Sequence, residues 1–162
     1  MKVAIITDTH YGARKGSTHL HDYFQLFYDN VFFPTLEKEG IDTIIHMGDI
    51  FDSRKSIDYQ SLEWSKKVVF DPMRKYKVYA ITGNHDCYYK NTNYVNSPEL
   101  LLNDYSNIST FSKATEINVD GLDILLLPWI NSENYDDSIS LIKNSKSKVA
   151  MGHLELNGFR AT

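Results

Sequence analysis

The sequence predicts an α/β fold with a mostly parallel sheet, flanking helices and an added antiparallel hairpin. Apolar, β-branched runs alternate with helical segments over roughly the first hundred residues, which is typical of right-handed βαβ units. An Asp120-Gly121 pair between two strand-like runs indicates a tight hairpin. Polar motifs follow four of the expected strands directly, as ligand-binding residues do at the carboxyl edge of open parallel sheets.

The expected strands are short and rich in apolar or β-branched residues. They cover residues 2–7, 41–47, 77–82, 115–119, 122–127 and 148–151. The segment between residues 11 and 18 is polar, and we expect a loop there. No internal repeat or confident domain boundary is visible, so one domain is predicted.

The expected helices follow from an apolar stripe and from residues that begin or end helices. A helix over residues 19–39 should stop at Gly40, with Pro34 kinking it. A second, over residues 58–70, has Asp58 as its N-cap. Two more are expected over residues 97–103, with Ser97 as N-cap, and over residues 135–143.

Composition limits the function classes. The chain has 162 residues, 42% of them hydrophobic and 23% charged, which fits one globular domain. No stretch approaches the roughly 18 apolar residues of a membrane span. Cys87 is the single cysteine, so no internal disulfide forms and a cytoplasmic setting is expected, the host cytoplasm if the chain is viral. The net charge of -4 indicates no basic face, so DNA contact would depend on metals, local Lys and Arg, or a partner.

Four polar motifs carry the residues expected to do chemistry. They are Asp8-Thr9-His10, Gly48-Asp49-Ile50-Phe51-Asp52, Gly83-Asn84-His85-Asp86 and Gly152-His153. Each motif alone is weak, because Gly, Asn and Asp also favour ordinary turns. Their joint occurrence, each after an expected strand, points to one shared site for divalent metal ions.

The side chains in these motifs suit a two-metal phosphoesterase. Asp8 and His10 are spaced i, i+2, so extended backbone would place both on one side and at the same ion. Asp49 has two oxygens and can bridge two ions, while Asn84 and His153 offer neutral ligands. Paired ions of this kind activate water and neutralise phosphoryl oxygens.

Other polar residues in and near the motifs are candidates for supporting roles. His85 would face the substrate and protonate the leaving oxygen. Asp86 would orient His85, and Asp52 would support the ligands. The phosphate-contact candidates are Arg14, Arg54 and Lys55.

The motifs resemble, in order, the D-x-H, G-D-x-x-D, G-N-H-D/E and G-H signatures of the calcineurin-like metallophosphoesterase superfamily. Further stretches resemble DNA repair nucleases of the SbcD type and, more narrowly, the recombination endonuclease subunits of T-even-like phages. Those stretches are residues 53–55, 89–91, 128–129 and 154–159.

The resemblance implies a sandwich fold and a specific chemistry. Asp8, His10, Asp49, Asn84 and His153 would hold two Mn²⁺ ions, or Mg²⁺ or other divalent ions, with Asp49 bridging them. His85 would be catalytic without being a ligand. The reaction would be hydrolysis of DNA phosphodiesters, exonucleolytic on duplexes and endonucleolytic on single strands. An SMC-like coiled-coil ATPase would be the partner, and the nuclease would form a homodimer.

The sequence departs from the family pattern at one point. The final G-H-x-H motif, which supplies two more histidine ligands in the family, is absent. We therefore expect residues 1–162 to be a metallophosphoesterase domain that is incomplete at its C-terminal end. Two alternatives stay open: a phosphoesterase acting on nucleotides or small phosphodiesters, and a catalytically incomplete binding module.

Overall fold

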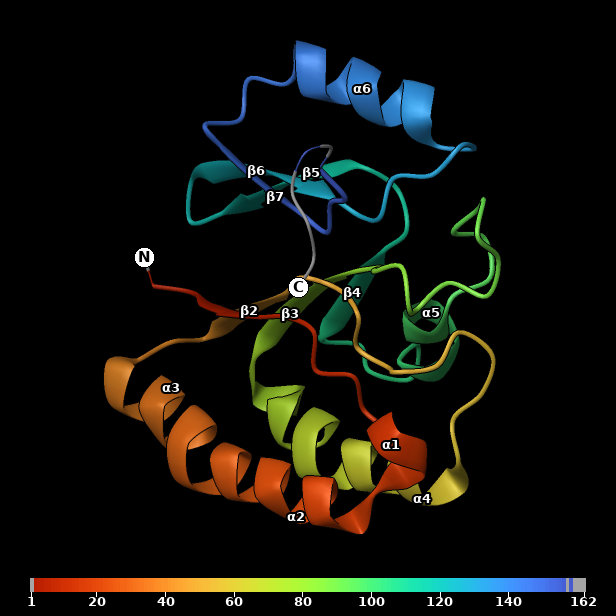
Figure 1. Cartoon of the computed structure of the whole chain (residues 1–162). Coiled ribbons are helices and arrows are strands. Elements are labelled where there is room, and N and C mark those ends of the chain that lie inside the picture. Colours follow the sequence, from red (N-terminus) through yellow and green to blue (C-terminus); the bar gives the residue numbers. More distant parts are fainter. Residues whose placement is uncertain (1, 157, 159–162) are drawn as a thin grey trace.

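Two sheets pack face to face at the centre of the molecule, with helices on the outer face of each. The computed structural model describes residues 2–156 and 158. Figure 1 shows the long helices of the first half beneath one sheet and helix α6 (Tyr135–Asn144) above the other. This helix–sheet–sheet–helix layering confirms the predicted α/β sandwich.

The first sheet is entirely parallel, in the order β1-β2-β3-β4. Its strands are β1 (Ala4–Ile6), β2 (Thr43–His46), β3 (Lys77–Ile81) and β4 (Ile108–Phe111). The first three confirm the sequence prediction, whereas β4 was not predicted. It is only four residues long and has no apolar run of its own, so its pairing with β3 defines it.

The second sheet has the order β5-β6-β7 and mixes directions. Strands β5 (Thr115–Val119) and β6 (Leu122–Leu127) form the antiparallel hairpin predicted at Asp120-Gly121. Both turn residues have positive φ, 50° and 85°, as a two-residue turn matched to strand twist requires. Strand β7 (Val149–Gly152) then pairs parallel to β6 after the crossover through α6.

Two apolar layers hold the sheets and helices together. One lies between the sheets and is built from alternate residues of both: Ile45, Tyr79, Ile81, Ile117, Val119, Ile124 and Leu126. The other joins the opposite face of the first sheet to the helices. Because the first sheet is buried on both faces, β2 is buried at every position, which explains why the adjacent residues Ile44 and Ile45 are both apolar.

The predicted helix over residues 19–39 consists of three joined segments. They are α2 (Thr18–Phe27), the π-helical turn η1 (Tyr28–Phe32) and α3 (Phe33–Glu39). Pro34 lies at the start of α3, next to the π turn, where its missing N–H is tolerated. Gly40 ends the helix with φ 63°, as predicted.

The next helix begins at Asp58, as predicted, because the Asp58 carboxylate accepts a 2.8 Å hydrogen bond from the Ser61 amide. It comprises α4 (Tyr59–Ser65) and the π turn η2 (Lys66–Phe70). A 3₁₀ turn, η3 (Pro72–Lys75), follows.

Two local predictions were wrong. Helix α5 (Ser97–Leu101) is capped by Asn96 and not Ser97, because the Asn96 side chain accepts from the Glu99 amide at 2.9 Å. The expected loop after the first motif contains the short turn α1 (Ala13–Gly16). There Arg14 and Lys15 are left-handed, a conformation that sequence propensity disfavours.

Candidate metal centre

The loops after β1 and β2 run side by side from the carboxyl edge of the first sheet. The Asp8 amide donates to the Gly48 carbonyl at 3.1 Å, and the His10 amide donates to the Asp49 carbonyl at 3.0 Å. Tyr11 then continues the pairing as a parallel bridge to Phe51. These main-chain bonds bring the first two motifs together although about forty residues separate them.

The structure brings all five predicted metal ligands into one cluster. Nε2 of His10 lies 3.8 Å from Asp8 and 3.6 Å from Asp49. On the other side of Asp49, Nε2 of His153 lies 3.5 Å away. Asn84 completes the series, because its Oδ1 lies 2.9 Å from Nε2 of His153. Ligand atoms of Asp8, Asp49 and His153 all lie within 4.8 Å of one another.

Asp49 occupies the middle of this cluster and is only 3% exposed. Its Oδ2 faces His10 and its Oδ1 faces His153. Oδ1 also accepts a 2.8 Å hydrogen bond from the His85 amide. A carboxylate buried among histidines, with no Lys or Arg beside it in the described chain, calls for cationic compensation.

Two glycines allow Asp49 to sit this deep. A Cβ on Gly83 would lie 2.2 Å from Asp49 Oδ1 and 2.3 Å from its amide nitrogen. A Cβ on Gly48 would lie 2.8 Å from the Gly83 amide nitrogen and 2.9 Å from His153 Nδ1. These two glycines therefore act in packing, because a side chain at either position would force the motif loops apart.

His153 is held in the tautomer that a metal ligand needs. Its Nδ1 lies 2.9 Å from the Met47 carbonyl oxygen, which only accepts, so Nδ1 carries the proton. Nε2 therefore directs a lone pair at Asn84 Oδ1, another acceptor. A cation between these two atoms satisfies both, and a carbonyl that orients a histidine is usual around bound metals.

Three of the clustered residues have strained backbones. Asp8, His10 and Asp49 all have positive φ, at 52°, 45° and 51°. The extended backbone that we assumed for the first motif is therefore wrong, although Asp8 and His10 do converge. Each such conformation costs about 1–3 kcal/mol and is typical of functional sites.

His85 lies beside the cluster, in the turn that follows β3. Its ring is 5.0 Å from the His10 ring, edge to face. Its Nδ1 donates to the main-chain carbonyl of Asp52 at 2.9 Å, which leaves Nε2 as the ring nitrogen free of that bond. The main-chain amide of His85 donates to Asp49, and the Asp52 carbonyl orients the ring. The sequence did not predict this role of the Asp52 main chain.

Asp86 does not orient His85 as we expected. Its Oδ1 accepts from the amides of Ile50 and Phe51 at 3.0 and 3.1 Å, and its Oδ2 accepts from Gly83 at 2.9 Å. Burial raises the pKa of Asp86 to about 6, against the lowering effect of these amides. Asp86 therefore locks two motif loops together through their backbones.

Asp52 reaches toward the other side of the cluster. Its Oδ1 is 3.5 Å from His10 Nδ1, too long for a formed hydrogen bond, and that nitrogen is buried without a partner. The carboxylate still favours the proton on Nδ1, and His10 Nε2 then directs its lone pair at the cluster.

His46 is a core histidine at the end of β2. Its Nδ1 accepts from the Gly48 amide at 3.3 Å, so its Nε2 donates to the Thr9 hydroxyl at 3.1 Å. Thr9 in turn donates to the Ile50 carbonyl. Burial lowers the pKa of His46 to about 3, so the ring stays neutral and links the first two motif loops.

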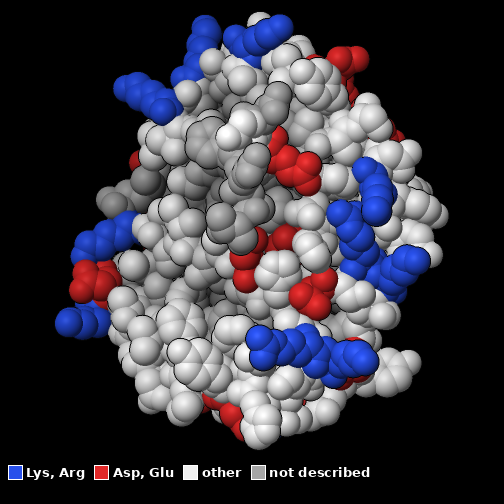
Figure 2. Space-filling model, in the orientation of Figure 1, with Lys and Arg blue, Asp and Glu red and all other residues white. Residues whose placement is uncertain are grey.

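The three phosphate-contact candidates have different environments. Arg14 and Lys55 are exposed. Arg54 is engaged: its Nη1 donates to the carbonyls of Cys87 and Tyr89 at 3.2 and 3.4 Å, and its guanidinium lies 5.2 Å from the Trp129 ring centroid. Figure 2 shows acidic side chains near the middle of one face, with Lys and Arg groups beside and below them.

A network of asparagines, which the sequence did not reveal, anchors the loop after the third motif. Buried Asn93 donates to the carbonyls of Ser112 and Trp129 and accepts from Asn131. Its main-chain carbonyl accepts from Asn96. Isolated asparagines in a loop carry no sequence signal for such pairing, because the partners come from segments up to 38 residues away.

The donor set fits a divalent cation. Carboxylate oxygens, an amide oxygen and imidazole nitrogens converge with their lone pairs inward, and the central carboxylate has no basic partner in the described chain. This mixture of oxygen and nitrogen ligands suits borderline ions such as manganese.

Within residues 2–156 and 158, no helix combines the length and the apolar character of a membrane span.

Comparisons with known proteins concern the family and the fold of the chain. The family model for calcineurin-like phosphoesterases matches residues 1–161. A curated relative named exonuclease subunit 1, from Enterobacteria phage T4, is 39% identical over 125 residues, which is 76% of this chain and 37% of the relative. The chain thus spans little more than a third of that relative's length.

A solved structure has a similar fold. It is a protein of unknown function from Aquifex aeolicus, with a TM-score of 0.51 and 17% identity. The match covers 96% of this chain and 80% of that one. At this identity the likeness concerns the fold alone.

Proposed function

Because this chain belongs to the calcineurin-like phosphoesterase family, we propose that it is the catalytic part of a divalent-metal-dependent DNA nuclease. The phage relative is named an exonuclease subunit, which supports DNA as the substrate. We further propose a role in recombination or double-strand-break repair, in the host cytoplasm. The family match over residues 1–161 supports assigning the chain to the phosphoesterase domain.

The observation that carries the proposal is the position of Asp49 between two histidines. With His10 facing one carboxylate oxygen and His153 facing the other, Asp49 would hold divalent metal together with both histidines. Asp8 would add to the His10 side, and Asn84 would add to the His153 side. Bound Mn²⁺ or Mg²⁺ would activate the attacking water and neutralise charge on the phosphoryl oxygens.

His85 is proposed as the residue that moves a proton. Its Nδ1–H is held by the Asp52 carbonyl, which keeps the ring edge-on to His10 at the cluster. Nε2, when protonated, can donate to the oxygen that leaves the phosphorus. Because Nδ1 donates to the Asp52 carbonyl, Nε2 is the ring nitrogen of His85 that can transfer this proton.

We also propose two protein partners. The word "subunit" in the relative's name supports a complex, and an SMC-like ATPase is our candidate. A homodimer is supported by exposed apolar side chains on the outer side of α2 and η1. These side chains are Tyr23, Leu26, Phe27 and Val31.

The experiment that tests the function compares two substrates under metal control. Linear duplex DNA and bis-p-nitrophenyl phosphate are each incubated with the protein in Mn²⁺, in Mg²⁺ and in EDTA. The nuclease proposal expects DNA cleavage that EDTA abolishes. Cleavage of only the small diester would assign the chain to small phosphodiesters instead.

A metal titration separates the remaining alternative. Calorimetry with Mn²⁺ should detect binding that His153→Ala weakens, whereas the exposed His19→Ala variant should behave as wild type. DNA binding without metal binding or cleavage would support a binding module and overturn the catalytic assignment.

A further inference from the structure

A pocket of about 340 Å³ lies beside the metal centre and shares a wall with it. The wall contains residues 51–54 and 85–88. Asp52 and His85 face the centre, since Asp52 Oδ1 approaches His10 and the Asp52 carbonyl accepts from His85. Their chain neighbours Phe51, Ser53 and Asp86 line the pocket. The metal centre and the pocket therefore lie on the two sides of these wall residues.

The lining of this pocket combines a flat ring, apolar side chains and hydroxyl groups. Tyr88 supplies the ring, and Lys55 supplies an exposed positive charge. The apolar members are Ile57, Val95, Leu100 and Leu101, and the hydroxyl groups come from Ser53, Ser56 and Ser97. The volume is at the lower end of the range for small-ligand sites, about 300–1,000 Å³.

Hydrogen bonds hold the walls of the pocket in place without a ligand. The Tyr88 amide donates to the Val95 carbonyl at 2.9 Å, which closes the base of the loop between them. Arg54 clamps the Cys87 carbonyl at 3.2 Å. In the same antiparallel pairing as Tyr88 and Val95, the Ser97 amide donates to the Asp86 carbonyl at 2.9 Å. A pocket that exists before binding is typical of a recognition site.

One apolar side chain that lines the pocket is largely exposed to solvent. Leu100 is 64% exposed although it lines the pocket. Tyr88, which lines the same pocket, is 42% exposed, so both side chains are accessible to a ligand. Tyr88 itself is fixed edge-to-face against Tyr89, with 4.8 Å between ring centroids.

We propose that this pocket binds one unpaired nucleobase of the DNA strand being cut. The inference rests on the proposed nuclease function and defines its substrate as single-stranded or locally unpaired DNA. Because the pocket and the metal centre share this wall, the base we assign to the pocket is one close to the phosphate held at the centre. Tyr88 and Leu100 would sandwich that base, the serine hydroxyls would bond its edge, and Lys55 would contact a neighbouring phosphate.

The base must be unpaired because a base inside a duplex is enclosed by its partner and its stacked neighbours, and must leave the stack to enter a pocket. A base that is already single-stranded enters at the lowest cost, since it has no pairing to lose. The pocket therefore favours single strands and frayed ends over intact duplex.

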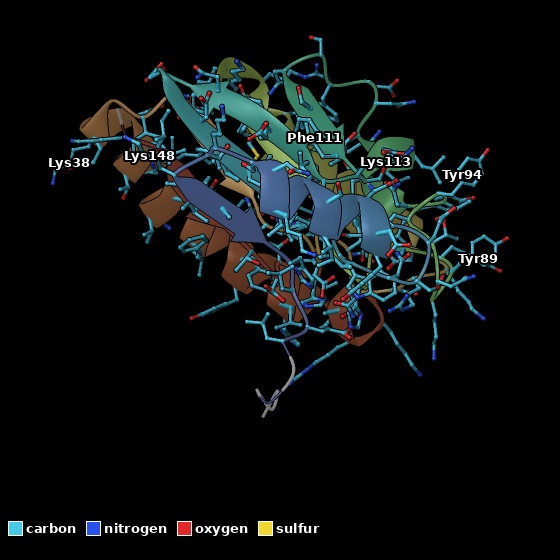
Figure 3. The ribbon with its side chains drawn as sticks, turned by 90° about the horizontal axis from the view of Figure 1, so that it is seen from above. Lys38, Tyr89, Tyr94, Phe111, Lys113 and Lys148 are labelled. Carbon is cyan, nitrogen blue, oxygen red and sulfur yellow. The ribbon has the colours of Figure 1, made fainter. Side chains whose placement is uncertain are left out.

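Tyr94, in the same loop, and Leu26, on α2, provide matched controls. Figure 3 shows Tyr89 and Tyr94 projecting outward on the same side of the molecule. Tyr94 is 83% exposed and is not among the residues that line the pocket. Leu26, on α2, is 62% exposed and matches Leu100 in type and exposure.

The first test does not depend on cleavage. Deoxyadenosine, which lacks a phosphate for the metals, is titrated to about 10 mM into the isotopically labelled protein. We expect NMR shifts confined to residues 53–57 and 95–101, lost in Tyr88→Ala and Leu100→Ala and kept in Tyr94→Ala and Leu26→Ala. A second variant, Ser56→Trp, fills the pocket without removing its walls and should also abolish the shifts. Absence of shifts in the wild type would overturn the pocket assignment.

The second test uses the wild-type reaction. A single abasic nucleotide is moved along an oligonucleotide, and cleavage at each bond is measured in Mn²⁺. At one fixed distance from the cut, the lost base should lower kcat/KM by about 5- to 150-fold, and Tyr88→Ala should remove that dependence. Equal cleavage at every abasic position would overturn the proposal. Absence of all cleavage, with nucleoside shifts intact, would count against the nuclease function and leave the pocket assignment supported by the first test.

Discussion

The Cα of Gly83 and the carboxylate of Asp49 are so close that a Cβ on Gly83 would lie 2.2 Å from Asp49 Oδ1. No L side chain fits at that distance, and the nearest obstacles include backbone as well as the carboxylate. The third motif thus contributes to the metal centre in two ways: Gly83 leaves room for Asp49, and Asn84 supplies a ligand oxygen.

Gly83→Ala should therefore displace Asp49 and weaken Mn²⁺ binding by about 10- to 100-fold, the range seen when residues that orient ligands are changed. Calorimetric titration measures the affinity. Gly40→Ala is the control, because nothing lies within 4 Å of a Cβ there and Gly40 ends a distant helix. Equal affinities in the Gly83→Ala variant and the wild type would contradict the close packing.

His85→Ala should abolish most cleavage without loss of metal. His85 contacts the cluster through its amide, which the substitution keeps, while the ring that moves the proton is removed. A fall of about 10²–10⁴ in kcat is expected. Mn²⁺ affinity, measured alongside, should match the wild type, and a loss of metal in this variant would reassign His85 as a ligand.

His46 should make stability depend on pH below neutrality. Burial lowers its pKa to about 3 from an ordinary 6.5, so the unfolded chain binds a proton that the folded protein rejects. The stabilisation is complete above pH 6.5 and falls by about 1.4 kcal/mol per pH unit as the pH drops from there toward 3.

His46→Gln removes that titration and should flatten this part of the curve relative to wild type. Urea denaturation at several pH values between 7 and 4 measures it. His19→Gln should leave the pH dependence unchanged, because His19 is exposed. Parallel curves for wild type and His46→Gln would show that His46 is not the group responsible.

Asn93→Asp should destabilise the fold by about 3–5 kcal/mol. The buried Asn93 amide group donates to the carbonyls of Ser112 and Trp129, and a carboxylate in its place would face both as an unpaired charge. Thermal or urea denaturation at pH 7 reports the change. Asn91→Asp, on the exposed part of the same loop, should stay within about 0.5 kcal/mol of wild type.

Arg14→Ala should weaken DNA binding evenly across sequences and lower the salt dependence of binding by about 0.9 in log–log slope. Arg14 is exposed in the strained turn that follows the first motif, two residues beyond Gly12. Fluorescence anisotropy at several salt concentrations measures the slope. Lys38→Ala, at the far end of α3, is the control, and an unchanged slope for Arg14→Ala would remove it from the phosphate contacts.

The sequence by itself determined the strand–helix alternation, the Asp120-Gly121 hairpin and the identity of the clustered side chains. These follow from local rules, because apolar periodicity, turn chemistry and metal-ligand residue types are properties of short segments. It also indicated that the four motifs meet, since parallel strands share one carboxyl edge.

Only the tertiary structure decided how the motifs are held. Three long-range contacts to the main chain hold them: the Met47 carbonyl with His153, the Asp52 carbonyl with His85, and the Asp86 carboxylate with the amides of the second motif. Every residue carries a carbonyl and all but proline an amide, so a main-chain partner leaves no mark in the amino-acid sequence. The same is true of the positive φ at Asp8, His10 and Asp49, where packing overrides the local preference against that conformation.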